Sequence, residues 1–88
     1  MIQGKRHDLA DGDEILEYGE YGWHAEHKKW YCLPPQTGDF YSGQGSLGNH
    51  TIVEHEDGTI TVSPSILMTG HHGKQWHGYL ERGVWRQV

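Results

Sequence analysis

Glycine occupies 13 of the 88 positions, so few stretches are long enough to form an uninterrupted helix. Each glycine inside a helix costs roughly 1 kcal/mol relative to alanine. Much of the remaining sequence is rich in threonine, isoleucine, valine, tryptophan and tyrosine, which suit pleated strands. We therefore predict an all-β protein, and 88 residues are enough for one domain but not for two.

Three hairpins are predicted, each from two strand-like segments that flank a turn. They span residues 21–33, 50–63 and 75–88. Alternation of side-chain types with a period of two runs along their arms and is typical of a strand with one buried face. The middle hairpin contains Asp57-Gly58, a dipeptide that favours tight turns. We expect these hairpins to form a small antiparallel sheet that curls into a barrel or a sandwich.

The predicted core follows from the same alternation. Four tryptophans and five tyrosines supply a large apolar area for so short a chain. We expect most of the core among the apolar residues of the hairpin arms, namely Trp23, Trp30, Ile52, Val53, Ile60, Val62, Leu80 and Trp85. Because Ile52 and Val53 are adjacent, they cannot both point inward. An aromatic side chain left exposed would mark a binding face.

The segments outside the hairpins are predicted to be less regular. Residues 1–14 are polar and end in an acidic run, which indicates a flexible arm before a single domain at 15–88. Residues 13–18 fit either one helical turn or a short strand. The glycine-rich segment 34–49 is predicted to be a long loop, and loops of this length are usually functional or disordered. Strand edges are expected to be protected by charged and histidine side chains or by a homodimer.

Charge and composition limit the classes of partner. The formal net charge of −5 disfavours a nucleic-acid phosphate backbone as the main partner. No apolar run predicts a membrane segment or a signal peptide, and the lone cysteine cannot form an internal disulfide. These features favour a small acidic, histidine-rich cytoplasmic protein that binds neither nucleic acid nor membrane.

The long loop supplies the first candidate binding site. Its middle carries an acidic residue and two aromatic residues that could contact a protein partner: Asp39, Phe40 and Tyr41. The following glycines at 43–48 fit the pattern G-x-G-x-x-G, but a dinucleotide site needs a helix directly after the motif. Here a strand-like segment follows, so we predict no nucleotide site and no organic cofactor.

The histidines and the lone cysteine supply a second candidate. Zinc needs three or four converging nitrogen or sulfur ligands. His24 and Cys32 lie on opposite arms of the first hairpin, and His71, His72 and His77 are close together in sequence. No C-x-x-C or H-x-x-x-H pair is present, so the alternative is that the histidines are scattered over solvent-facing strand surfaces.

Residues 59–85 resemble a family of small uncharacterised proteins from phages and bacterial mobile operons. Ser63-Pro64-Ser65-Ile66 and the segment 76–83, WHGYLERG, carry the resemblance, together with an upstream WYCLPP at 30–35. The resemblance implies a phage setting, in the host cytoplasm, and unknown biochemistry. In that family further cysteines suggest a zinc-ribbon-like site, but two of those cysteine positions are not cysteine here.

If a metal site survives from that family, the resemblance implies that Cys32 and His77 approach each other. His24, His71 or His72 would then replace the lost cysteines. The alternative, which we favour, is that aromatic packing has replaced the metal.

No motif predicts an enzyme, because neither a nucleophile elbow nor a distinctive carboxylate pair is present. We expect a non-enzymatic binding module that acts through protein–protein contact, such as an inhibitor of a host or defence protein. The alternative is a small zinc-binding domain with a Cys/His site.

Overall fold

The computed structural model describes residues 1–88 and shows an all-β protein, as predicted. It contains no α-helix, and one 3-10 turn at His71–Gly73 is the only helical element. The ten strands are β1 (Ile2–Gln3), β2 (Lys5–Arg6), β3 (Glu20–His24), β4 (Lys29–Leu33), β5 (Gly45–Ser46), β6 (Thr51–Glu54), β7 (Ile60–Ser63), β8 (Ile66–Thr69), β9 (Gln75–Glu81) and β10 (Val84–Gln87).

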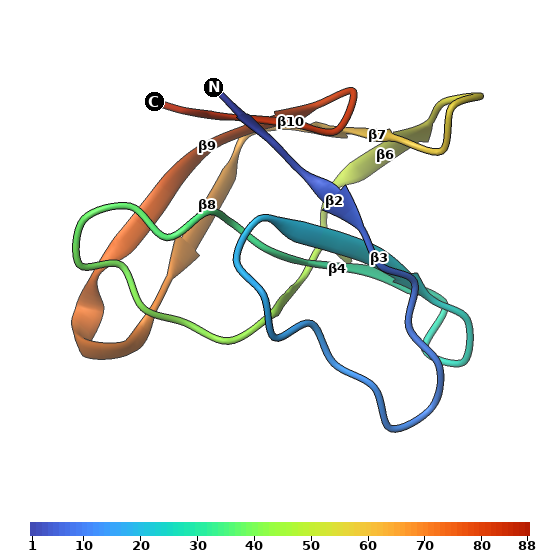
Figure 1. Cartoon of the computed structure of the whole chain (residues 1–88), viewed down its shortest axis with the longest axis horizontal. Coiled ribbons are helices and arrows are strands. Elements are labelled where there is room, and N and C mark those ends of the chain that lie inside the picture. The colour runs from blue at the N-terminus through green and yellow to red at the C-terminus, as the bar shows by residue number, and fades with distance from the viewer.

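The strands form two four-stranded sheets and one separate hairpin. The first sheet has the order β1-β10-β9-β8, the second has the order β2-β3-β4-β5, and β6 pairs only with β7. All strand pairs are antiparallel except β2 with β3. The two termini lie close together beside β10, and the β6–β7 hairpin extends away from the rest of the molecule (Figure 1). The antiparallel architecture is confirmed, while closure into a barrel or sandwich stays a prediction.

All three predicted hairpins are present as β3–β4, β6–β7 and β9–β10. The last one turns at Arg82 and Gly83, whose φ angles are 46° and 75°. Two successive positive φ angles match the twist of the flanking strands. In the β6–β7 turn, the Asp57 carboxylate accepts hydrogen bonds from the N–H and hydroxyl of Thr59 at 3.0 and 2.6 Å.

The N-terminal segment is paired with both four-stranded sheets, which corrects the prediction of a flexible arm over residues 1–14. β1 pairs with β10, β2 pairs with β3, and Leu9 is buried at 4 % exposure. These contacts run through the backbone: the His7 N–H donates to the C=O of Tyr21 at 2.8 Å. Side-chain polarity therefore misled the prediction, because a short strand needs no apolar side chain to join a sheet edge.

The structure also shows the conformation of segments 13–18 and 34–49, which the sequence predicts to be less regular. Residues 13–18 form neither the helical turn nor the short strand that the sequence allowed, but an irregular segment that ends in a turn. Within the long segment 34–49, β5 pairs with β4, and Phe40 is only 2 % exposed. This segment therefore contributes to the core and to a sheet edge.

The core lies between the sheets and combines aromatic with aliphatic side chains. Its main cluster is Tyr21, Cys32, Phe40, Leu47, Ile60, Val62, Ile66, Trp76, Leu80 and Trp85. Four of the eight predicted core residues belong to it: Ile60, Val62, Leu80 and Trp85. Trp23, Trp30 and Ile52 are only half-buried, and Val53 is 52 % exposed, so the prediction was wrong for Val53. The physical reason is that Val53 points to the face of the β6–β7 hairpin opposite Ile52, and that face lies in solvent.

No helix in the chain has the length and apolar character needed to cross a membrane.

Candidate functional site: a tryptophan groove beside an acidic hairpin

The predicted loop site is only partly available to a partner. Phe40 is buried in the core, so it cannot contact a partner through its ring, which corrects that part of the prediction. Tyr41 is 56 % exposed and its ring lies 5.2 Å from that of His71. Asp39 pairs with Lys74 at 3.1 Å, and this lysine lowers the pKa of the Asp39 carboxyl. Partner binding by Asp39 and Tyr41 stays a prediction.

The predicted metal ligands do not form a metal centre, since no three His, Cys, Asp or Glu side chains are arranged to hold a metal ion. Cys32 is fully buried on β4, and burial raises the pKa of its thiol to about 12, which opposes the thiolate that zinc requires. His77 is exposed on β9 of the other sheet. His71 and His72 are exposed in the 3-10 turn. The sequence could not reveal that Cys32 and His77 belong to different sheets.

His24, the remaining predicted metal ligand, is buried in the β3–β4 hairpin by contacts with neighbouring residues. Its Nδ1 accepts a hydrogen bond from the His27 N–H at 3.1 Å, and the two imidazole rings stack with centroids 3.7 Å apart. His27 in turn contacts the Tyr31 hydroxyl at 2.9 Å. His24 therefore serves to hold the β3–β4 turn.

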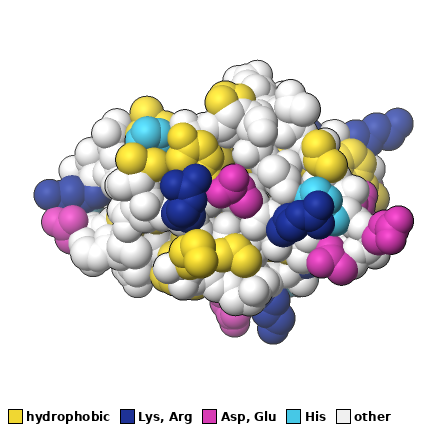
Figure 2. All heavy atoms as spheres, turned by 90° about the horizontal axis from the view of Figure 1, so that it is seen from above, with side chains coloured by type: hydrophobic (Ala, Val, Ile, Leu, Met, Phe, Trp, Pro, Cys, Tyr) yellow, Lys and Arg dark blue, Asp and Glu magenta, His cyan; other side chains and the backbone are white.

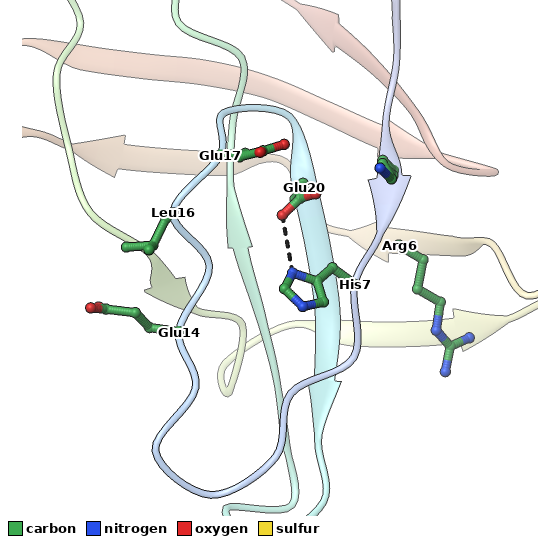
Figure 3. A pocket seen from close by; sticks show the side chains of 7 residues that line it. Arg6, His7, Glu14, Leu16, Glu17 and Glu20 are labelled. Carbon is green, nitrogen blue, oxygen red and sulfur yellow. Dashed lines mark hydrogen bonds and ion pairs between the residues drawn. The ribbon is translucent and has the colours of Figure 1, made fainter.

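A polar cleft of about 410 Å³ lies between the β2 strand and the loop that precedes β3 (Figure 3). His7 points to the largely buried Glu20, and the Nδ1–Oε1 distance is 3.3 Å. Glu14 and Glu17 stand on the loop, while Arg6 points away from the glutamates (Figure 3). Since Lys5 and His7 lie among the three glutamates, positive and negative groups are mixed along the walls of this cleft.

A second hollow, which we call the tryptophan groove, is lined by Arg6, Trp23, Trp30, Ile52 and Glu54. Its volume is about 300 Å³. Trp23 and Trp30 face each other directly across the β3–β4 pair, with ring centroids 5.5 Å apart. Both rings and Ile52 are half-buried, so they present apolar area to solvent. The groove therefore offers aromatic and aliphatic surface at the boundary between the second sheet and the β6–β7 hairpin.

Arg6 fixes one wall of the tryptophan groove. Its guanidinium donates to Asp8 at 2.8 Å, to Glu54 at 2.7 Å and to the C=O of Gly58 at 2.8 Å. It also lies 4.9 Å from the centroid of the Trp30 ring. Its hydrogen bonds to Asp8 raise the pKa of Arg6 and lower that of the Asp8 carboxyl. The arginine thus joins β2 to the β6–β7 hairpin and favours the ionised form of Asp8.

An acidic cavity continues from the tryptophan groove along the β6–β7 hairpin. It has a volume of about 500 Å³ and is lined by Glu54, His55, Glu56, Asp57 and Arg82. Hydrogen bonds from Thr59 lower the pKa of Asp57. Figure 2 shows acidic side chains next to basic ones and a histidine at the end of the molecule that carries this hairpin. Elsewhere on this face, exposed apolar side chains form separate small patches (Figure 2).

Part of this site was missed from the sequence. Arg6 and Asp8 belong to the segment 1–14 that the sequence predicts to be a flexible arm, and Glu54 belongs to the middle hairpin. The one usable signal was the surplus of tryptophan, because an aromatic residue left out of the core was expected to mark a binding face.

Two of the segments that carry the resemblance, 63–66 and 76–83, meet in the first sheet, whereas the third, 30–35, includes residues of β4 in the second sheet. Residues 66–69 pair with 75–78 as β8 and β9. The Ser65 hydroxyl and the His77 Nε2 are 3.0 Å apart, and His50 Nε2 lies 3.2 Å from the C=O of Ser65. The Ser65–His77 contact lies on the surface and borders neither the polar cleft, the tryptophan groove nor the acidic cavity. Comparisons with protein-family models, with curated proteins and with solved structures found no match to the chain.

Proposed function

We propose that the protein is a non-enzymatic binding module that holds a segment of a partner protein in the tryptophan groove. The observation that carries this proposal is the pair of half-buried indole rings, Trp23 and Trp30, whose centroids lie 5.5 Å apart and which line an open groove together with Ile52. Tryptophan is enriched among the residues that dominate binding energy at protein interfaces. Neither ring is a fully buried member of the main core, although Trp30 packs against it, and complete burial of both rings would gain apolar stabilisation.

The wall of the tryptophan groove is already organised, which supports the same proposal. Arg6 is held by two carboxylates and one carbonyl, and its guanidinium lies over Trp30. A partner would therefore meet a surface whose polar groups are in place, and such preorganisation lowers the entropic cost of binding. The biological setting that we propose, a phage or mobile operon with a host protein as target, rests on the resemblance of residues 59–85 alone.

Selection from a display library of random dodecapeptides tests this proposal. The immobilised native chain serves as bait, and the enriched peptides are then titrated against purified variants. Trp23→Ala removes one ring of the groove. Leu67→Ala is the matched control, because Leu67 is 60 % exposed on β8 and does not line the groove. Circular dichroism checks that both variants fold.

We expect peptides that bind the native chain and Leu67→Ala equally, and Trp23→Ala at least about tenfold more weakly, as for a residue at a binding hot spot. Enriched peptides that bind Trp23→Ala as tightly as the native chain would place binding elsewhere. If no peptide is enriched, the proposal of a groove for extended segments fails.

A further inference from the structure

We infer that the partner segment binds as an added β-strand on the open edge of β6 and places a lysine or arginine in the acidic cavity. This inference rests on the proposed function and names the mode of binding and the chemistry of the partner. Three observations carry it: the unpaired edge of β6, the direction of its side chains, and the charge of the hairpin.

The edge of β6 that faces away from β7 has no strand partner. The His55 N–H donates to the C=O of Thr59 at 2.8 Å, and this pair continues the β6–β7 register. Backbone groups alternate in direction along a strand, so those of Val53 also point to β7. The N–H and C=O groups of Ile52 and Glu54 therefore point outward. They form a row of donors and acceptors that an extended chain can pair with.

The side chains of β6 place this edge next to the tryptophan groove. Ile52 and Glu54 are two residues apart, so they share one face of the strand, and both line the groove. A strand added beside β6 would send alternate side chains to the same face. One apolar side chain of that strand would then meet Trp23 and Trp30.

The charge of the acidic cavity indicates the chemistry of a second side chain on the partner strand. Three carboxylates and two guanidinium groups line the groove and the acidic cavity: Glu54, Glu56, Asp57, Arg6 and Arg82. Arg6 is already engaged by Asp8 and Glu54. Glu56 has no ion pair within the chain and is exposed. The cavity therefore keeps an excess of negative charge that complements a basic side chain.

A second copy of the chain fits this edge less well. Each copy carries a formal net charge of −5, and pairing through β6 would bring a second acidic hairpin to the same place. Like charges opposed across an added strand pair are unfavourable. A basic, extended peptide meets both the backbone and the charge requirement.

The experiment uses the peptides selected on the native chain, three variants of the chain and one altered set of the peptides. Ile52→Pro removes the outward N–H, and proline is tolerated where an edge-strand N–H faces solvent. Ile52→Val is its matched control, because it keeps that N–H and a β-branched side chain. Glu56→Gln removes one charge from the acidic cavity with little change of shape. Each selected peptide is also made with its lysines and arginines replaced by glutamine.

We expect selected peptides to contain a lysine or arginine and to bind Ile52→Pro at least about tenfold more weakly than Ile52→Val. Glu56→Gln, and the glutamine-substituted peptides, should each lose about fivefold or more in affinity at low salt. If peptides depend on Trp23 but lack basic residues, or bind Ile52→Pro normally, the inference is overturned while the proposed function stands. If binding does not depend on Trp23, both fail.

Discussion

The clearest division in this molecule is between the two tryptophans of the core and the two of the groove, and Trp85→Phe tests it. Trp85 is 1 % exposed, and its ring meets that of Trp76 edge to face with centroids 5.4 Å apart. Its Nε1–H donates to the C=O of Gly19 at 2.8 Å in a buried hydrogen bond. Phenylalanine keeps an aromatic ring at this position but loses the donor and part of the ring volume.

The expected cost follows from these contacts. Loss of a hydrogen bond costs about 1 kcal/mol, and the Gly19 C=O is not orphaned because it also accepts from the Lys5 N–H at 3.1 Å. The missing ring atoms correspond to roughly two buried methylene groups at ~0.8 kcal/mol each. Trp85→Phe should therefore lower the free energy of unfolding by about 2–3 kcal/mol, or the melting temperature by roughly 10–15 °C.

Trp30→Phe is the matched comparison, because Trp30 is half-buried in the groove and its indole N–H makes no hydrogen bond within the chain. We expect it to cost less than about 1 kcal/mol. Urea denaturation followed by far-ultraviolet circular dichroism measures both variants, and the m-values should be unchanged. Equal losses for Trp85→Phe and Trp30→Phe would refute the division between core and groove tryptophans.

Three further variants or probes test single features. Burial raises the pKa of the Cys32 thiol to about 12. We therefore expect an aromatic disulfide reagent at pH 8 to label Cys32 only after denaturation. Rapid labelling of the native chain would show that the Cys32 side chain on β4 is accessible to solvent. Gly22→Ala would drive its methyl group onto the backbone of the N-terminal segment and should cost about 1–3 kcal/mol, whereas Gly43→Ala has free space and should cost much less. Hydrogen bonds from Arg6 and from the Trp23 N–H hold the pKa of Asp8 below its ordinary value. Its contribution to stability is therefore present above about pH 4 and is lost as the pH falls further. Asp8→Asn should flatten the decline in stability below about pH 4, and an unchanged decline would contradict that role.

Local sequence signals were sufficient for the strands and turns of the three hairpins, but not for β1, β2 and β5. The third hairpin illustrates this, because Gly83 supplies the positive φ of the turn, and the alternation of residues 75–81 matches the burial of Trp76, Gly78 and Leu80. Such signals act over a few residues, which is the range that a single sequence reports well.

The contacts that the sequence did not reveal are those between distant segments. Phe40 fills the core from a glycine-rich loop, and β2 joins β3 through its backbone, although both lie in polar surroundings in the sequence. The tryptophan groove depends on the same kind of contact, since Arg6 reaches Glu54 from 48 residues away. The candidate site could therefore be anticipated only as exposed aromatic surface, and not as a defined set of residues.

The central claim is that β6 offers an open edge beside the tryptophan groove, and amide hydrogen exchange measured by NMR tests it most directly. The N–H of Val53 faces β7, so it serves as the internal reference for the outward N–H groups of Ile52 and Glu54. We predict that the amides of Ile52 and Glu54 exchange much faster than that of Val53 in the free chain. They should become protected when a selected dodecapeptide binds. Protection of all three amides in the free chain, or no added protection with the peptide bound, would contradict the account.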